Sequence, residues 1–250
     1  MTSHADAKKN APPATETPDM RERGGLIDGK PQMLDKRLFM QLLAFGGCSN
    51  PAAPAEALRK SGIEGVLYAD INDPRGIALL TFSEDETHFA TTVRTLLNEK
   101  PFGDYALKPE YSMFGRTYTI GYEPKLEDHL IHRSRRVALD PETEWAVWYP
   151  LRRKGEFNKL PREEQRPILG EHGTIGKAYG LAGLATDIRL ACHGMDKNDN
   201  DFVIGLHGKR LAPLSKLVER MRKTVQTSSY MEKMGPFFTG RVVWRSNADA

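Results

Sequence analysis

One histidine, His172, falls among apolar residues at helical spacing. Counted from Ile168, intervals of four, three and four residues reach His172, Ile175 and Tyr179. A helix over residues 161–179 would turn these side chains to one face. One interpretation is a hydrogen-bonded core histidine. The other is an axial ligand to a large apolar iron cofactor, because haem iron needs only one proximal histidine. Zinc is disfavoured, because no second and third ligand stand at suitable spacing.

A charged pair follows on a predicted strand over residues 184–192. The two-residue period of a strand places on one face Ala185, Asp187, Arg189 and Ala191. That face is either solvated, with Asp187 and Arg189 as a surface ion pair, or it lines a pocket. In a pocket, the small alanines would leave room for a flat ligand.

Arginine and hydroxyl side chains form a third group. Its members are Arg133, Arg135, Arg152, Arg153, Arg222, Thr227 and Ser228. Arginine forks suit carboxylates, although scattered arginines commonly only solvate a surface. The strong motifs of nucleotide-binding loops, serine hydrolases, zinc proteases and paired CxxC sites are absent from the sequence.

The composition is that of an ordinary globular protein. Of 250 residues, 39% are hydrophobic and 28% charged, which is enough for a core and excludes a collagen or a wholly disordered chain. A net charge of +3 is weak support for nucleic acid, so no nucleic-acid partner is expected. The sequence contains no run of 18 apolar residues, so it predicts no membrane span. Two cysteines and the lack of a secretory signal after Met1 predict a cytoplasmic protein.

The pattern of elements occurs twice along the chain. Strands are expected at 37–45, 65–70, 77–83, 118–122, 144–150, 184–192, 202–206 and 237–244, and helices at 51–60, 83–98, 161–179 and 211–224. This strand-helix-strand-strand-helix-strand order predicts an α+β fold of duplicated ferredoxin-like halves. The antiparallel sheets would pack as a sandwich or close as a barrel. A doubly wound sheet is disfavoured, because the glycine fingerprint is missing.

Three regions are therefore predicted. Residues 1–35 read as a disordered N-terminal tail, because the stretch around residues 11–18 has almost nothing to bury. Residues 36–140 would form the N-terminal ferredoxin-like half, and residues 141–250 the C-terminal half.

Five segments of the C-terminal half carry a family resemblance. They are residues 148–151 (WYPL), 160–164 (LPREE), 171–176 (EHGTIG), 221–222 (MR) and 235–238 (GPFF). In order and approximate spacing they resemble the chlorite dismutase family, which includes the coproheme decarboxylases of haem synthesis. The resemblance implies a dimeric α+β barrel that assembles as a homopentamer and binds haem b or coproheme in the C-terminal half.

The resemblance also implies roles for single residues. His172 falls where the family places its proximal iron ligand. Tyr149 falls where coproheme decarboxylases keep a tyrosine that forms a radical and takes hydrogen from a propionate. Propionates would be held by Arg222 and Thr227, with Ser228 beside them and with Arg133, Arg135 and Arg153 as further candidates.

The sequence departs from the family pattern at one position. Thirteen residues after His172 the family has arginine in chlorite dismutases and often glutamine in coproheme decarboxylases, but this sequence has Ala185. A shift of two residues before Gly194 places Asp187 at the distal position, with Arg189 next on the same face. We therefore expect Asp187 to act as a proton shuttle near the oxidant.

The leading prediction is oxidative decarboxylation of coproheme to haem b, driven by hydrogen peroxide or a similar small oxidant. Chlorite dismutation or another haem peroxidase activity is an alternative, and it would need Arg189 as the distal cation. A non-enzymatic haem carrier or sensor, in which Asp187 and Arg189 only tune the pocket, is a second alternative. A barrel with an empty pocket is a third.

Overall fold

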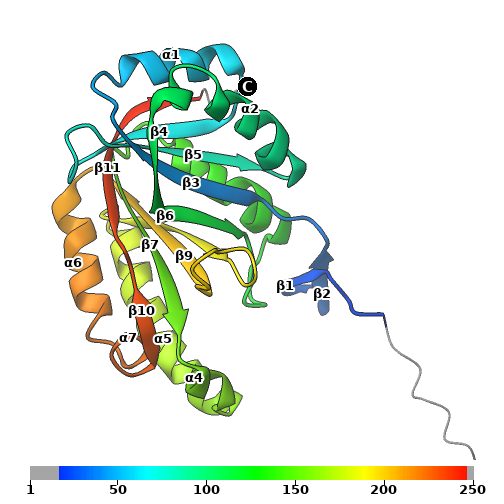
Figure 1. Cartoon of the computed structure of the whole chain (residues 1–250). Helices are drawn as coiled ribbons and strands as arrows, with labels where there is room; N and C mark the ends of the chain where they lie inside the picture. Colours follow the sequence, from blue (N-terminus) through cyan, green and yellow to red (C-terminus); the bar gives the residue numbers. More distant parts are fainter. Residues whose placement is uncertain (1–16, 247–250) are drawn as a thin grey trace, which may run out of the picture.

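Eight antiparallel strands close into a barrel (Figure 1). The structure is a computed structural model that describes residues 17–246. Around the barrel the strand order is β7-β11-β4-β5-β3-β6-β8-β9, and β9 pairs again with β7. The barrel strands are β3 (Phe39–Gly46), β4 (Gly65–Asp70), β5 (Ile77–Ser83), β6 (Ala106–Arg116), β7 (Trp145–Arg153), β8 (Thr186–Ala191), β9 (Phe202–Gly208) and β11 (Phe238–Arg245).

The two halves of the barrel have the same topology. Strands β6-β3-β5-β4 form the N-terminal half and strands β11-β7-β9-β8 form the C-terminal half. Numbered within each half, both orders run four-one-three-two, which is the ferredoxin-like arrangement. Pairings of β11 with β4 and of β6 with β8 join the halves. The α+β prediction is confirmed, and the two sheets close as a barrel instead of packing as a sandwich.

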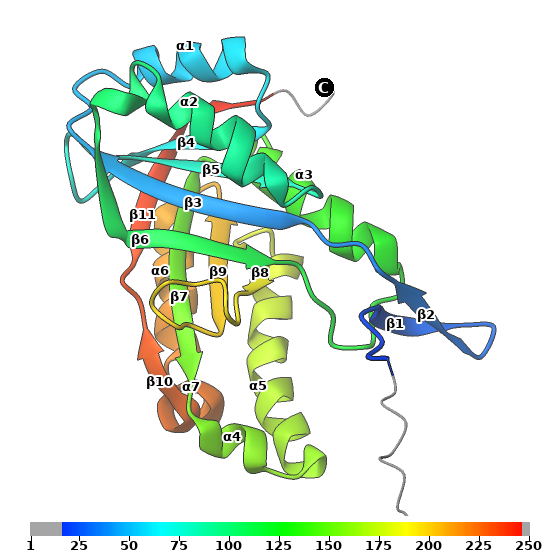
Figure 2. The same ribbon diagram turned by 45° about the vertical axis from the view of Figure 1, so that its right-hand side comes forward.

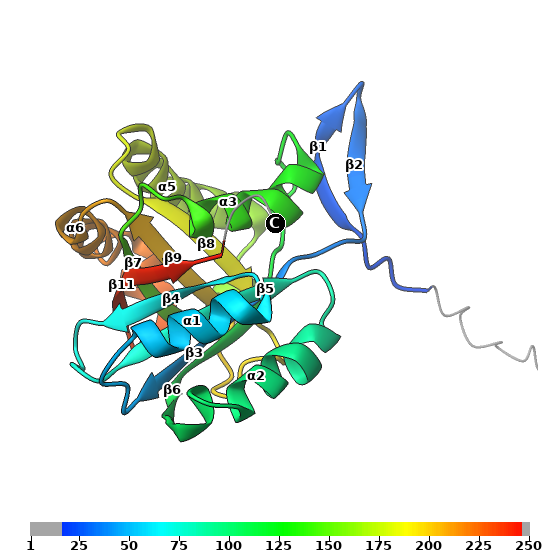
Figure 3. The same cartoon turned by 90° about the horizontal axis from the view of Figure 1, so that it is seen from above.

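Helices cover the outer face of each half. Helices α1 and α2 lie on the N-terminal half, and α5 and α6 lie on the C-terminal half, as Figures 2 and 3 show. The helices are α1 (Ala52–Ser61), α2 (Arg94–Asn98), α3 (Arg133–Leu139), α4 (Gly155–Lys159), α5 (Arg162–Leu181), α6 (Leu211–Met221) and α7 (Val225–Tyr230). Single π-helical turns precede α2 and α3, at Phe89–Val93 and Asp128–His132. Within residues 17–246, no helix has the length and apolar character needed to cross a bilayer.

The barrel interior is a continuous apolar core to which all eight strands contribute. Alternate residues of each strand point inward, so β7 gives Ala146 and Trp148 while β8 gives Ile188 and Leu190. Trp148 is fully buried, and Gly205 on the neighbouring strand leaves the space that its indole ring fills. The opposite residues of β7, β8 and β9 face outward, toward α5 and α6.

Two predicted elements of the N-terminal half are corrected. Residues 118–122 are not a strand, because the Glu123 carboxylate accepts the backbone N–H groups of Ile120, Gly121 and Tyr122 and folds them into a turn. The fourth strand is β6, which carries Pro109, a residue that sequence reasoning does not expect inside a strand. The helix expected from Ser83 begins only at residue 87.

The predicted tail is wrong for part of its length. Strands β1 (Glu22–Ile27) and β2 (Lys30–Leu34) form a hairpin that projects from the barrel (Figure 1). The hairpin is anchored by the Gln32 amide, which donates to the carbonyls of Gly25 and Glu123, and by Glu22, which pairs with Arg116. The partners Glu123 and Arg116 lie about ninety residues along the chain. Residues 1–16 of the predicted tail lie outside the described residues.

Candidate functional site

The candidate site lies on the outer face of the C-terminal half. Strand β9 pairs with both β7 and β8, so their cross-strand partners form rows on one face. One row is Val147, Leu206 and Asp187. The next row is Tyr149, Ile204 and Arg189. The third row is Leu151, Phe202 and Ala191. The face is therefore apolar in its middle, with a tyrosine at one side and a carboxylate and an arginine at the other, about 10 Å away.

Helix α5 presents His172 toward this face. The predicted stripe is confirmed, since Ile168, His172, Ile175 and Tyr179 are, with Gln165 and Gly176, the less exposed residues of the helix. The Thr224 hydroxyl donates to the Met221 carbonyl at 2.8 Å, so its oxygen is free to accept from Nδ1–H of His172, 3.4 Å away. This contact favours the tautomer that leaves a lone pair on Nε2. Burial and the charge of Arg189 lower the pKa of His172, which keeps the imidazole neutral.

Asp187 is held between two arginines. Arg133 donates to the Asp187 carboxylate at 2.9 Å and to its backbone carbonyl at 2.8 Å, and Arg189 approaches the other carboxylate oxygen at 3.1 Å. Burial alone would raise the pKa of Asp187, but the charges of Arg189 and Arg133 outweigh it and hold the pKa below its usual range. The carboxylate is therefore ionised at neutral pH and acts as the anchor of both guanidinium groups.

Tyr149 lies at the other end of the same face. It is 5% exposed, and its ring stacks on Phe237 with centroids 4.5 Å apart. The Arg222 guanidinium lies over Phe237, 5.7 Å from its centroid. Burial, together with the negative charge of Asp187, raises the pKa of Tyr149. The phenol is thus protonated at neutral pH, close to an arginine that forms no ion pair within residues 17–246.

Arg153 is a half-buried cation without an anion. Its guanidinium carbon lies 4.5 Å from the Phe157 centroid and 5.0 Å from the Phe202 centroid. The Nε atom is buried and has no hydrogen-bond partner within the described chain, and no carboxylate pairs with this side chain there. Burial lowers the pKa of the guanidinium, although an arginine stays protonated in proteins. A buried, unpaired guanidinium is suited to a carboxylate that arrives with a ligand.

Three predicted site residues have other roles in the structure. Arg135 pairs with Glu64 and Glu84 of the N-terminal half, so we withdraw it from the site. Thr227 lies next to the site, but its backbone N–H donates to Thr224 in the cap of α7. The Ser228 hydroxyl donates to the Thr224 carbonyl at 2.9 Å. Thr227 and Ser228 thus support the turn behind His172 through their contacts with Thr224.

Sequence reasoning missed Tyr118 and His129. A cavity of about 10 Å³, the size of one water molecule, is lined by these two residues together with Arg133 and Arg189. His129 Nε2 lies 3.1 Å from the Tyr118 carbonyl, to which it donates, so Nδ1 remains able to accept a proton. Burial lowers the pKa of His129. The strand expected at 118–122 hid Tyr118, and no helix was expected around His129, so the sequence carried no signal for this contact.

Helix α5 is exposed over most of its length. Of the 20 residues in this helix only Tyr179, near its C-terminal end, is buried. Gly170 and Gly173 have no atom near the position of an added Cβ. Full burial in α5 is therefore confined to its C-terminal end, and His172 lies in the part-buried stretch before it. The donor set of neutral imidazole, tyrosine and unpaired arginines fits an iron porphyrin with carboxylate substituents. Among residues 17–246, no three His, Cys, Asp or Glu side chains gather as a metal cluster.

The fold defines the class: an α+β barrel of two ferredoxin-like halves, with the candidate site on the outer face of the C-terminal half. The chlorite dismutase family model matches residues 67–243, which is more than half of the chain. The chain belongs to the chlorite dismutase family. This family includes haem-dependent enzymes.

Three relatives show the extent of the similarity. Coproheme decarboxylase of Mycolicibacterium smegmatis is 26% identical over 147 residues, which cover 54% of this chain and 61% of that protein. The chain thus spans less than two thirds of that relative. A heme-binding protein from Thermus thermophilus superposes with a TM-score of 0.62 at 18% identity, covering 83% of this chain and 91% of that chain. A mutant chlorite dismutase from Candidatus Nitrospira defluvii gives 0.62 at 13% identity, covering 82% and 91%. These two structures establish the likeness of fold.

Proposed function

We propose that the protein binds an iron porphyrin and decarboxylates coproheme to haem b with hydrogen peroxide. The observation that carries this proposal is the placement of Tyr149 on the sheet face toward which α5 presents His172. The similarity to coproheme decarboxylase of Mycolicibacterium smegmatis supports the same reaction class. A haem carrier would need the histidine but would have no use for a buried phenol flanked by an unpaired arginine.

The proposed ligand would lie between α5 and the sheet. His172 Nε2 is the expected iron ligand, with Thr224 holding the ring through Nδ1. Ile204, which is half-buried at the edge of the apolar cluster, offers an apolar surface to the macrocycle. Arg222 and Arg153, which have no carboxylate partner in the described chain, are the expected partners of the propionates.

In the proposed mechanism the chain positions two hydrogen transfers. A bound iron porphyrin supplies oxidising equivalents that come from peroxide. Tyr149 gives up its phenolic hydrogen as an electron and a proton, then takes a hydrogen atom from the propionate carbon next to the ring. Loss of carbon dioxide and one further electron leaves a vinyl group. Each vinyl group formed thus consumes one peroxide, which is reduced to two water molecules with a proton from solvent.

The proposed proton transfers involve the groups around the small cavity that Tyr118 and His129 line. We expected Asp187 to be the proton shuttle, but its low pKa makes it a weak base and a poor acid near neutral pH. We propose instead that Asp187 orients Arg189 and Arg133. His129, neutral and next to Arg189, is better matched to accept a proton.

The test uses the full-length protein mixed with ferric coproheme and hydrogen peroxide, followed by mass spectrometry of the porphyrin. Stepwise loss of two carboxylates as carbon dioxide is expected. The Tyr149→Phe variant keeps the ring stacked on Phe237 but lacks the phenolic hydrogen, so it should bind coproheme and leave its mass unchanged. Tyr179→Phe is the matched control, because it removes a hydroxyl from a buried tyrosine of α5, and it should react like wild type.

Different outcomes of this experiment would refute decarboxylation, the role of Tyr149 or porphyrin binding. An unchanged coproheme mass in wild type, with a normal binding spectrum, would refute decarboxylation and leave porphyrin binding intact. Equal turnover by wild type and Tyr149→Phe would refute the role of the phenol. A missing Soret band with both haem and coproheme would refute porphyrin binding itself.

Arg189 supports chlorite dismutation as a second candidate. Its side chain is 39% exposed and lies in the same row as Tyr149, where a cation could hold an anionic oxidant. The ion pair with Asp187 counts against it, because that carboxylate neutralises the cation. Oxygen release measured with an electrode after chlorite addition tests this candidate, and activity lost in Arg189→Gln but not in Arg152→Gln would establish it.

We further propose a cytoplasmic homopentamer, as the family resemblance implies. Sedimentation velocity of the purified protein tests the assembly, and a monomer at micromolar concentration would contradict it. Cell fractionation tests the compartment.

A further inference from the structure

The loop between β8 and β9 carries an alternating series of oxygen-bearing side chains. Residues 196–201 read DKNDND, so carboxylate or amide groups recur at every second residue from Asp196 through Asn198 to Asn200. Alternate spacing of this kind lets a short loop wrap several oxygens around one cation, as the first half of a calcium-binding loop does. Spacing alone is weak, so the inference depends on the geometry of the loop.

One oxygen of Asp196 organises this loop. Its Oδ1 accepts the backbone N–H of Asn198 at 2.7 Å and the side-chain amide of Asn200 at 3.1 Å. The backbone N–H of Asn200 lies 3.5 Å from the same oxygen. The second oxygen, Oδ2, is buried and has no partner among the described residues. A carboxylate that uses one oxygen for N–H groups has the other available for a cation.

A second unpartnered oxygen belongs to the side chain that is hydrogen-bonded to Asp196. Asn200 is 1% exposed and Asp196 is 9% exposed. The Oδ1 atom of Asn200 is buried without a partner in the described chain, although its amide nitrogen touches Asp196. The two side chains are hydrogen-bonded to each other, and each has one buried oxygen without a partner. Two such oxygens cost folding free energy unless a cation or a water molecule contacts them.

From these contacts we propose that the β8–β9 loop is a calcium site, with Asp196 Oδ2 and Asn200 Oδ1 as ligands. The ligand class is hard oxygen, which suits calcium better than a transition metal. Magnesium is less suited, because it demands octahedral geometry and keeps most of its water. One carboxylate gives few charges, so the affinity is expected to be roughly 10⁻⁴–10⁻³ M.

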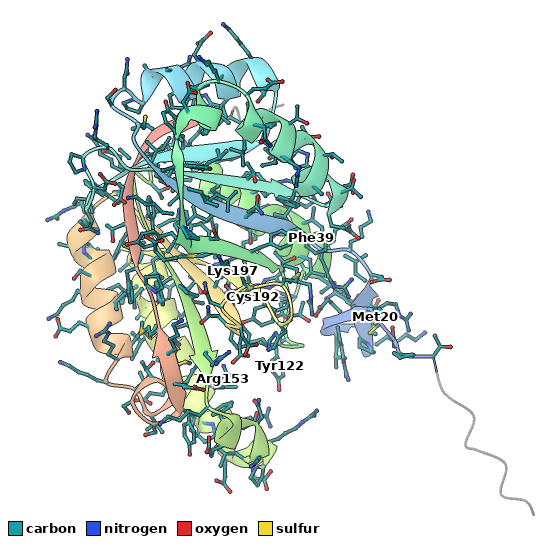
Figure 4. All side chains as sticks on the ribbon, viewed as in Figure 1. Met20, Phe39, Tyr122, Arg153, Cys192 and Lys197 are labelled. Carbon is teal, nitrogen blue, oxygen red and sulfur yellow. The ribbon has the colours of Figure 1, made fainter. Side chains whose placement is uncertain are left out.

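The loop is placed to act on the outer-face site. Asp201 accepts the backbone N–H of Arg153 at 2.8 Å, and its own N–H donates to the Leu151 carbonyl at 2.8 Å. Figure 4 labels Cys192 and Lys197 on this loop and Arg153 on the neighbouring strand. A cation that rigidifies the loop would therefore steady the end of β7 that carries Arg153.

The test titrates calcium chloride into the chelator-treated, full-length protein without porphyrin, using calorimetry and thermal melting. One saturable site is expected, with a rise in Tm of about 2–4 °C at a concentration tenfold above Kd. Magnesium chloride should bind at least roughly tenfold more weakly. Because no porphyrin is present, the result is independent of the proposed function.

Three variants make the test specific. Asp196→Asn should lose about tenfold or more in calcium affinity, because the charged ligand is gone. Asp199→Asn is the matched control, since it removes one charge from an exposed residue of the same loop, and it should bind within about twofold of wild type. Asn200→Asp adds a charged ligand and should gain about tenfold, a result that misfolding cannot imitate.

The overturning results are equally definite. Absence of saturable calcium binding by wild type up to roughly 10 mM would overturn the proposal and leave a bridging water as the partner of both oxygens. Equal affinities for the Asp196→Asn and Asp199→Asn variants would overturn the ligand assignment. Loss of affinity in Asn200→Asp would do the same.

Discussion

The two outer faces of the barrel share one topology and differ in how their helices meet them. On the N-terminal face, Phe45, Leu67 and Leu79 pack against Leu58 of α1 in a closed apolar cluster. Helix α1 buries three of its ten residues, whereas α5 on the other face buries one of twenty. Helix α6 closes only part of the C-terminal face, through Leu214, Leu217 and Met221.

This difference shows how a duplicated fold gains a site without a change of topology. The N-terminal face is sealed by side chains from both layers, so no ligand can lie between them. On the C-terminal face the charged pair Asp187 and Arg189 occupies positions where a seal would need apolar residues. The helix that lies there fully buries only Tyr179, near its C-terminal end, and offers His172 from its part-buried stretch. The stability of the barrel and the proposed chemistry are thus assigned to different faces.

The largest expected effect concerns the apolar cluster between α1 and the N-terminal sheet. Leu58→Ala should lower the free energy of unfolding by about 2–5 kcal/mol, because Leu58 of α1 is fully buried against the sheet. Leu169→Ala on α5 is the matched control, since Leu169 is 39% exposed and should change stability by less than about 0.5 kcal/mol. Urea denaturation of both variants measures the contrast. Equal losses would mean that α5 seals its face as α1 does.

The next effect concerns the proposed iron ligand. His172→Ala should lower porphyrin affinity by roughly 100-fold or more, about 2.7 kcal/mol, because residues that merely support metal ligands already cost 10–100-fold. The ferric absorbance spectrum should also shift. His193→Ala removes a histidine that is 60% exposed on the β8–β9 loop and should bind normally. A wild-type spectrum in His172→Ala would refute the ligand assignment.

A smaller effect concerns the unpaired cation. Arg153→Met should weaken coproheme binding by about tenfold, about 1.4 kcal/mol, through loss of one charge-assisted contact to a carboxylate. The apo protein should be as stable as wild type or more stable, because a buried unpaired charge is removed. Arg152→Met changes the neighbouring arginine, which pairs with Asp199 instead, and should leave affinity unchanged. Fluorescence-quenching titrations measure both.

The repeat of elements could be read from the sequence because each strand alternates and each turn is local. Residues 71–76, for example, form the turn between β4 and β5, and their own composition marks where one strand ends and the next begins. The β1–β2 hairpin could not be read, because its anchors are Gln32 and Glu123, far apart in the chain.

The same limit applies to the site. Strand and helix periods placed Asp187, Arg189 and His172 on the correct faces. They could not separate Arg133 from Arg135, because the helix α3 that turns these two residues apart was not expected. Thr224 and His129 enter the site only through tertiary contacts.

The smallest expected effect separates the shared interior from the site face. His207 lies inside the barrel, 2% exposed and edge-on to Trp148, and burial lowers its pKa to about 3. In the unfolded chain the imidazole of His207 binds a proton near pH 6.5, whereas in the native barrel it stays neutral at that pH. The free energy of unfolding must therefore fall as the pH drops below 6.5. At pH 6 the loss from this residue is about 0.8 kcal/mol, and it grows toward pH 3.

His207→Gln should reduce the dependence of the free energy of unfolding on pH, whereas His193→Gln should not. Urea midpoints between pH 7.5 and 5 measure this dependence. His172 and His129 also have a lowered pKa, so His172→Gln and His129→Gln together should flatten the remainder. If His172→Gln removed the whole slope and His207→Gln none of it, the acid sensitivity would belong to the site face and not to the interior.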